Sequence, residues 1–136
     1  MEINITEFFN DADAFEFSAS RAERGDNAGP ETWRNAVEEG TNKPLLTTRK
    51  QIKALRDYVK DFGAWSDEEI AAWSDTECNA LFIQLVSGDM REAESLCMDD
   101  KGEMDWAKYE ELAEKGTING NMYPGDDGKV YYSLSH

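Results

Sequence analysis

The stretch "AWSDEEIAAWSDTECNALFIQLVSG", residues 64–88, contains the tripeptide Trp-Ser-Asp twice, beginning at Trp65 and again at Trp73. The repetition suits either a repeated binding site or a folding signal. In both copies the Ser is followed three residues later by Glu, which is the capping-box pattern of a helix N-terminus. Two caps eight residues apart cannot begin one uninterrupted helix. The sequence therefore predicts a short helix at 67–72, a bend near Trp73 and a second helix at 75–87.

The second of these helices is apolar around most of its circumference. Between residues 75 and 87 the main polar interruptions are Glu77, Asn79 and Gln84. A helix that is hydrophobic on nearly all sides is usually buried in the middle of its domain. Gly88 follows the apolar run and is expected to end the helix. We therefore expect 75–87 to be the central, buried element.

The remaining elements follow from periodicity and from turn residues. Helices are expected at 5–13, 30–40, 49–63, 89–97 and 105–116. Two β-prone runs flank the turn sequence Pro-Gly-Asp-Asp-Gly and predict a C-terminal hairpin. Together these signals predict one α+β domain over 1–136, mostly helical, with a central buried helix and a C-terminal β-hairpin.

The predicted helix at 49–63 has an apolar side and a basic side. Its apolar residues share one side at 100° per residue: Ile52, Leu55, Tyr58, Val59 and Phe62. Four cations fall within an arc of about 60° and form what we call the basic stripe: Arg49, Lys53, Arg56 and Lys60. We interpret the stripe as a solvated face that pairs with nearby acids in preference to a phosphate-binding site.

The charge of the chain restricts its partners. The 136 residues carry 29 acids and 14 bases, a formal net charge of −15. Such a surface repels nucleic acid and anionic membranes, so direct binding to either is disfavoured. Three interpretations stay open: solubility, adaptation to high salt, and a surface that meets a basic partner protein, such as a nucleic-acid-binding groove.

Acids on the exposed faces of the predicted helices are the candidates for such a contact. Carboxylates spaced like phosphates compete for Arg and Lys through charge-assisted hydrogen bonds. The candidate partner-binding residues are Glu68, Glu69, Asp75, Glu77, Glu110, Glu111 and Glu114. The basic stripe is the alternative binding surface.

No catalytic signature accompanies this charge. The single histidine, His136, is the last residue, and Cys78 and Cys97 form no CxxC pair. We expect the two thiols to be reduced, with at least one in the core. Phosphate-binding glycine motifs and the EF-hand pattern do not occur, so neither a metal nor a cofactor is expected. The chain also lacks a signal-peptide or membrane-span pattern. It is therefore expected to be cytoplasmic and non-enzymatic.

Three segments resemble a family of small acidic proteins carried by bacteriophages and plasmids. They are "NAGPETWRNA" (27–36), "FGAWSDEEIAAWSDTECNALFIQLVSGDMRE" (62–92) and "GNMYPGDDGKVYYSL" (120–134). The resemblance implies the context of a mobile element, in which small acidic proteins often inhibit host defences. Anti-CRISPR and anti-restriction proteins are examples, and some resemble DNA in their charge.

Two functional hypotheses follow. The first is a non-enzymatic acidic inhibitor that binds a basic surface of a nucleic-acid-binding defence complex in the host cell. The alternative is an intracellular protein-binding accessory protein of the phage or plasmid, without DNA mimicry. The basic stripe favours the alternative slightly, because a pure DNA mimic has no use for it.

Overall fold

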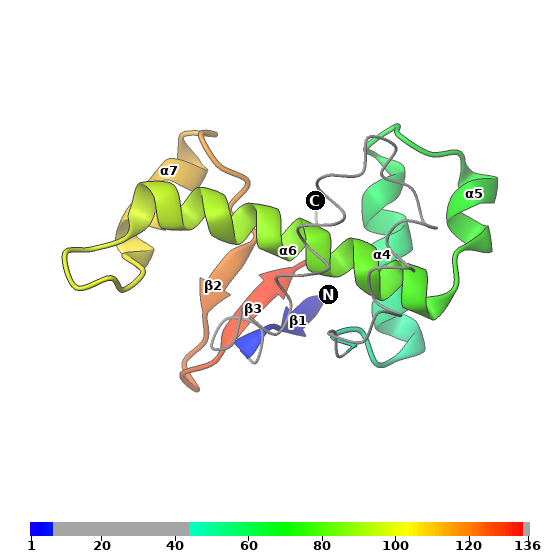
Figure 1. Ribbon diagram of the computed structural model, residues 1–136, viewed down its shortest axis with the longest axis horizontal. Helices are drawn as coiled ribbons and strands as arrows, with labels where there is room; N and C mark the ends of the chain where they lie inside the picture. Colours follow the sequence, from blue (N-terminus) through cyan, green and yellow to red (C-terminus); the bar gives the residue numbers. More distant parts are fainter. Residues whose placement is uncertain (7–43, 135–136) are drawn as a thin grey trace.

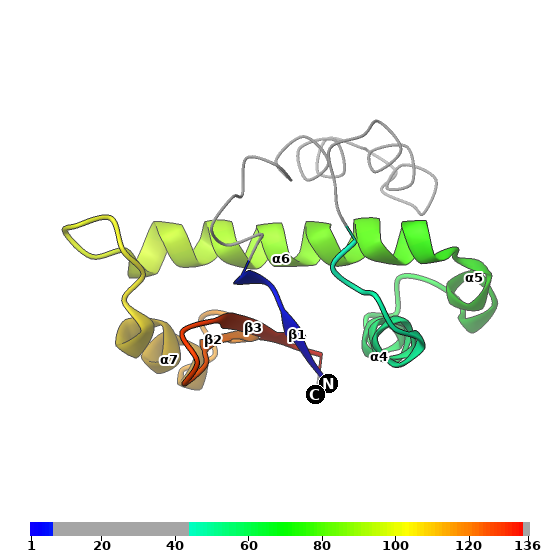
Figure 2. The same ribbon diagram turned by 90° about the horizontal axis from the view of Figure 1, so that it is seen from below.

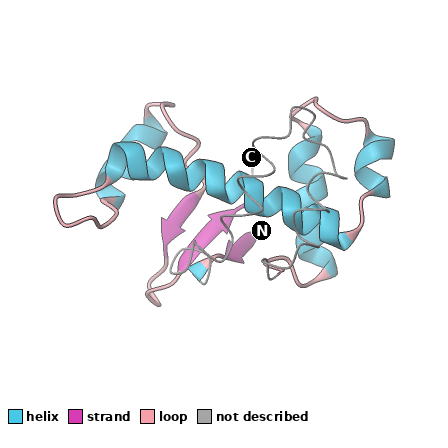
Figure 3. Ribbon diagram, viewed as in Figure 1, coloured by secondary structure: helices cyan, strands magenta, loops and turns pink. Residues whose placement is uncertain are grey.

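The computed structural model describes residues 1–6 and 44–134, and this part of the chain is an α+β fold. Its helices are α4 (Arg49–Lys60), α5 (Asp67–Ala72), α6 (Asp75–Cys97) and α7 (Trp106–Glu114). Its strands are β1 (Glu2–Asn4), β2 (Met122–Pro124) and β3 (Val130–Ser133). Figures 1 and 3 show the arrangement. The predicted fold class is confirmed. The helix expected at 30–40 and most of that at 5–13 lie outside the described residues.

The doubled Trp-Ser-Asp motif forms two consecutive helix starts, as predicted. The Ser66 hydroxyl accepts a hydrogen bond from the Glu69 amide at 3.2 Å, and the Ser74 hydroxyl accepts one from the Glu77 amide at 3.1 Å. Both capping boxes are complete, because each Glu side chain also accepts from the backbone of its cap. Trp73 lies between the helices in an extended conformation. The repeat therefore turns the chain from α5 into α6.

Helix α6 is longer than predicted, and the expected stop at Gly88 is wrong. The helix runs without a break from Asp75 to Cys97 and absorbs the separate helix expected at 89–97. A glycine inside a helix costs about 1 kcal/mol relative to alanine. Here that cost is outweighed because the following turns bury Met90, Ala93 and Cys97. Gly88 keeps an ordinary helical backbone, and no described residue lies within 4 Å of where its side chain would begin.

The first half of α6 is the buried centre that its composition predicts. Every residue from Cys78 to Ile83 is buried, and both cysteines of the chain are free and buried. Over 23 residues α6 is about 34 Å long. In Figure 2 it runs along the molecule, with α4, the sheet and α7 arranged along the same side of it.

Helix α4 buries a narrower face than expected. Thr48 and Gln51 form its capping box, and Ile52, Leu55 and Val59 are buried. Phe62, predicted to share this face, is 45% exposed and lies edge-on against Tyr58, with ring centroids 5.3 Å apart. The helix ends at Lys60, two residues before Phe62, so Phe62 does not continue the buried helical face, and Gly63, at φ +69°, then turns the chain.

The sheet contains the predicted C-terminal hairpin and one unpredicted strand. Its order is β1-β3-β2, all antiparallel, so the last strand of the chain is central. Tyr132 in β3 lies opposite Ile3 in β1 and opposite Met122 in β2, and all three side chains are buried. The Tyr132 ring packs edge-on against Phe82 of α6 at 5.3 Å. Three residues of β1 are too few for alternation to identify a strand from sequence.

Candidate functional site

The predicted partner-binding acids form two separate groups. Glu68, Glu69, Asp75 and Glu77 lie on α5 and the first turn of α6. Glu110, Glu111 and Glu114 lie on α7, near the other end of α6. Figure 1 places α5 and α7 at opposite ends of the molecule, separated by most of the α6 length. The structure therefore does not join the seven acids into one surface.

Three of the four acids in the first group already serve the fold. The carboxylates of Glu69 and Glu77 accept hydrogen bonds from the amides of Ser66 and Ser74 at 3.2 and 3.3 Å. Asp75 forms an ion pair with Arg49 of α4. Only Glu68 is an exposed acid with no hydrogen bond or ion pair to another described residue. A partner that used the other three would have to compete with these intramolecular contacts.

The basic stripe on α4 is matched by groups of the same chain. Besides the Arg49–Asp75 pair, Lys53 and Lys60 both approach Asp57, at 2.7 and 3.6 Å. The hydrogen bond from Lys53 holds the pKa of Asp57 below its usual value. These exposed pairs each stabilise the fold by well under about 1 kcal/mol. They do, however, reduce the positive potential that an anionic partner would meet.

Arg56 differs from the rest of the stripe because it is half-buried. Its Nη2 donates to the carbonyl oxygen of Trp73 at 2.5 Å, at the bend between α5 and α6. A cation is favourable at this place, where the last carbonyls of a helix lack intrahelical donors. The Nε of Arg56 is buried without a hydrogen-bond acceptor. Arg56 therefore stabilises the bend and is not available as a contact residue.

The acids of α7 form fewer hydrogen bonds and ion pairs with the described residues than the acids of the first group. Glu111 forms an ion pair with Lys115 at 2.8 Å, and this hydrogen bond lowers the pKa of Glu111. Glu110 and Glu114 are exposed, and neither forms a hydrogen bond or ion pair with a described residue. This end of the molecule therefore offers two carboxylates that a partner can bind without breaking an internal contact.

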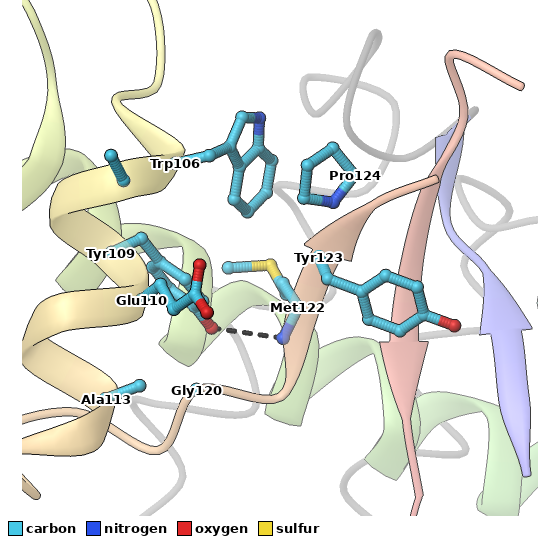
Figure 4. A pocket seen from close by; sticks show the side chains of 9 residues that line it. Trp106, Tyr109, Glu110, Ala113, Gly120, Met122, Tyr123 and Pro124 are labelled. Carbon is cyan, nitrogen blue, oxygen red and sulfur yellow. Dashed lines mark hydrogen bonds between the residues drawn. The ribbon is translucent and has the colours of Figure 1, made fainter. Parts of the chain in front are cut away.

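A groove of about 560 Å³ lies beside Glu110, between α7 and β2. Its described lining residues are Trp106, Ala107, Tyr109, Glu110, Ala113, Gly120, Met122, Tyr123 and Pro124. Figure 4 shows Trp106 and Pro124 facing each other across the opening, with the Met122 side chain between them. The Glu110 carboxylate lies beside Met122, whereas the Tyr123 ring points away from the groove.

Two contacts fix the width of this groove. The Tyr109 hydroxyl of α7 accepts a hydrogen bond from the Met122 amide of β2 at 3.1 Å. Gly120, at φ +70°, lies so close to α7 that an added Cβ would be 2.4 Å from the Cβ of Ala113. The groove is therefore closed at the Gly120 end and bridged by the Tyr109–Met122 hydrogen bond. Within α7, Trp106 packs edge-on against Tyr109, with ring centroids 5.4 Å apart.

The edge of β2 that faces the groove presents acceptors. Ser133 donates to the Asn121 carbonyl and Gly125 to that of Lys129, which puts residues 121 and 125 at the hydrogen-bonded positions of the ladder. Hydrogen-bonded positions alternate in an antiparallel pair, so the backbone groups of Met122 and Pro124 point away from β3. The Met122 amide is bound by Tyr109, and proline has none. The free backbone groups on this edge are therefore carbonyls.

A polar network inside the molecule escaped the sequence-based prediction. The Tyr132 hydroxyl donates to Asp89 Oδ2 at 2.5 Å, and the Asn119 amide donates to Oδ1 at 3.3 Å. The side-chain amide of Asn121 donates to the hydroxyls of Tyr132 and Tyr58 at 3.1 and 2.6 Å. Burial raises the pKa of Asp89, although these hydrogen bonds act in the opposite direction. The network joins α6, β3 and α4 and forms part of the fold.

Other site types receive no support from the described residues. In residues 1–6 and 44–134, no three His, Cys, Asp or Glu side chains are grouped so that they could hold a metal ion. Nor does any helix within these ranges combine the length and hydropathy required to cross a membrane.

Comparison of the whole chain with protein families, curated proteins and solved structures finds no match. The resemblance to small acidic proteins of phages and plasmids therefore stays a prediction.

Proposed function

We propose that the protein is a non-enzymatic acidic inhibitor that binds a basic surface on a nucleic-acid-binding defence complex, of the anti-CRISPR or anti-restriction type, in the host cytoplasm. The observation that carries the proposal is the α7 end of the molecule. There Glu110 and Glu114 are exposed and have no partner among the described residues, and Glu110 lines an open groove. The net charge of −15 adds long-range attraction toward a basic surface.

Within this proposal, α7 makes the main contact and the α5 end assists. Binding through Glu69, Asp75 or Glu77 would remove a capping bond or the pair with Arg49. Binding through Glu110 or Glu114 would break no hydrogen bond or ion pair with a described residue. The partner contact is local, because the two acid groups are separated by most of the roughly 34 Å of α6. DNA, by contrast, presents a phosphate charge about every 1.7 Å along its axis.

Affinity capture from a bacterial lysate tests this function. The immobilised protein is expected to retain a basic nucleic-acid-binding protein at low salt, to release it as salt rises, and to lose it to excess duplex DNA. Glu110→Gln/Glu114→Gln should capture less of the partner than a matched control, Glu92→Gln/Glu94→Gln, which changes two exposed acids of α6. Capture that is insensitive to both salt and DNA would contradict the proposal.

The second candidate is an accessory protein of the phage or plasmid that binds protein without mimicking DNA. The separation of the two acid groups favours it, since no continuous row of the predicted acids follows the molecule. Charge reversal at Lys53 distinguishes the candidates, because Lys53 is exposed and, among the described residues, forms an ion pair only with Asp57. Lys53→Glu should leave an acidic inhibitor active and should weaken an interaction that depends on the stripe. Arg56 is unsuitable for this test because it holds the bend before α6.

A further inference from the structure

We infer that the groove between α7 and β2 receives an arginine side chain of the basic partner, with the guanidinium bound by Glu110. The inference rests on the proposed function, because it assumes a basic partner, and adds to it the contact site and the residue type recognised. The groove, at about 560 Å³, is within the size range of specific binding pockets and can seat one long side chain with part of its backbone.

The walls match the two parts of an arginine. Trp106 and Pro124, on either side of the buried Met122, offer apolar surface to the methylene stem of the side chain. A cation held over the Trp106 ring also gains cation–π attraction, which favours arginine because its planar group stacks on aromatic rings. Glu110 then supplies a carboxylate beside the same surface, and a carboxylate can bind a guanidinium with two parallel hydrogen bonds.

The β2 edge selects for a donor-rich group. The backbone groups of Met122 and Pro124 that point away from β3 are two carbonyls and one amide, and Tyr109 already binds that amide. A peptide strand cannot extend the sheet here, since strand addition requires free donors as well as acceptors on the edge. A guanidinium has five donors and no acceptor, which matches the carbonyl of the exposed Pro124 together with the Glu110 carboxylate.

The test uses three eight-residue peptides that differ only at three positions, which hold arginine, lysine or citrulline. Citrulline keeps the shape of arginine and lacks its charge. Binding is followed at low salt by backbone and indole NMR shifts, which report affinity and location together. The arginine peptide should shift the Trp106 indole and the Met122 amide, should bind more tightly than the lysine peptide, and should bind far more tightly than the citrulline peptide.

Two exposed acids on the same helix provide the variant and its control. Glu110→Gln should weaken binding of the arginine peptide roughly tenfold, since a hydrogen bond to a charged group contributes on the order of 1.4 kcal/mol or more. Glu114→Gln, outside the groove lining, should change it less than about twofold. Thermal unfolding of both variants verifies that the fold is intact.

The outcomes separate this inference from the proposed function. If the arginine peptide binds but shifts only residues near Glu68, or if both variants weaken it equally, the groove assignment is wrong while the proposed function stands. If citrulline binds as well as arginine, the recognised feature is not the cation and the inference is overturned. If none of the basic peptides binds at low salt, the proposed function fails with it.

Discussion

Ser66 and Ser74 show how single residues direct this chain. Each serine hydroxyl accepts a hydrogen bond from a first-turn backbone amide that has no partner within its helix. The side chain of the Glu three residues later accepts a hydrogen bond from the backbone amide of the serine. Such local patterns can be predicted from sequence because both partners lie within one turn. Asp89 could not be predicted, since its partner Tyr132 is 43 residues away and no local signal marks their contact.

Replacement of either capping serine should lower the free energy of unfolding. Ser66→Ala and Ser74→Ala each remove an acceptor for a helix amide, which costs about 1 kcal/mol. Urea unfolding measures the loss. Ser95→Ala, at an exposed position inside α6, is the matched control and should be neutral or slightly stabilising. Loss of partner binding at unchanged stability would show that the serines belong to a binding site.

Asp89 should cause the free energy of unfolding to fall as pH rises. Because burial raises its pKa in the folded state above the reference value of 3.8, the folded protein holds this proton more tightly than the unfolded chain. The contribution is complete below pH 3.8 and is lost as pH rises through the raised pKa. Asp89→Asn should remove this component from urea unfolding measured across pH.

Asp57 provides a control of opposite sign for the Asp89 experiment. Its pKa is lowered by Lys53, so its small contribution is present at neutral pH and is lost as pH falls through the lowered pKa. Asp57→Asn should therefore leave the loss of stability with rising pH in place. An unchanged pH profile in Asp89→Asn would contradict the role assigned to Asp89.

At the scale of elements, the predictions succeeded where a helix start or periodicity was strong and failed where tertiary packing decided. The sequence predicted where four helices begin and where the hairpin turns. The helices are α4, α5, α6 and α7. The end of α6 was not, because Gly88 is a local stop signal that the burial of the later turns overrides. Strand β1 exists only through its pairing with β3, which no local sequence reveals.

The continuous α6 makes Gly88→Ala a stabilising substitution. Its backbone is helical and no described residue lies within 4 Å of the added Cβ, so the change removes the flexibility cost of glycine without a clash in this part of the chain. We expect a gain of about 0.5–1 kcal/mol in thermal or urea unfolding. Gly63→Ala has equal open space but a φ of +69°, and should destabilise instead. A destabilised Gly88→Ala would indicate that α6 is broken at this residue.

At the scale of the whole molecule, excess negative charge is the dominant electrostatic fact. With 29 acids against 14 bases, we expect repulsion within the folded state to exceed what the exposed ion pairs of the described residues recover. The composition gives the net charge, but it could not show where the acids gather. The groove could not be predicted from the sequence either, because it forms where Gly120 brings the chain against α7.

Added salt should therefore stabilise the fold. The melting temperature is expected to rise as sodium chloride is increased from low to physiological ionic strength, because screening weakens long-range repulsion between like charges. Glu68→Gln/Glu114→Gln should raise the low-salt melting temperature and reduce this dependence, since both acids are exposed and have no described partner. A melting temperature that falls with salt would show that the ion pairs outweigh the repulsion.

The central place of β3 also sets the order in which the sheet can assemble. Residues 2–4 are synthesised well before residues 130–133, yet among the described strands β1 and β2 each pair only with β3. The three-stranded sheet can therefore form only after β3 has left the ribosome. Nascent chains that stop before Val130 should be degraded faster than chains that include β3.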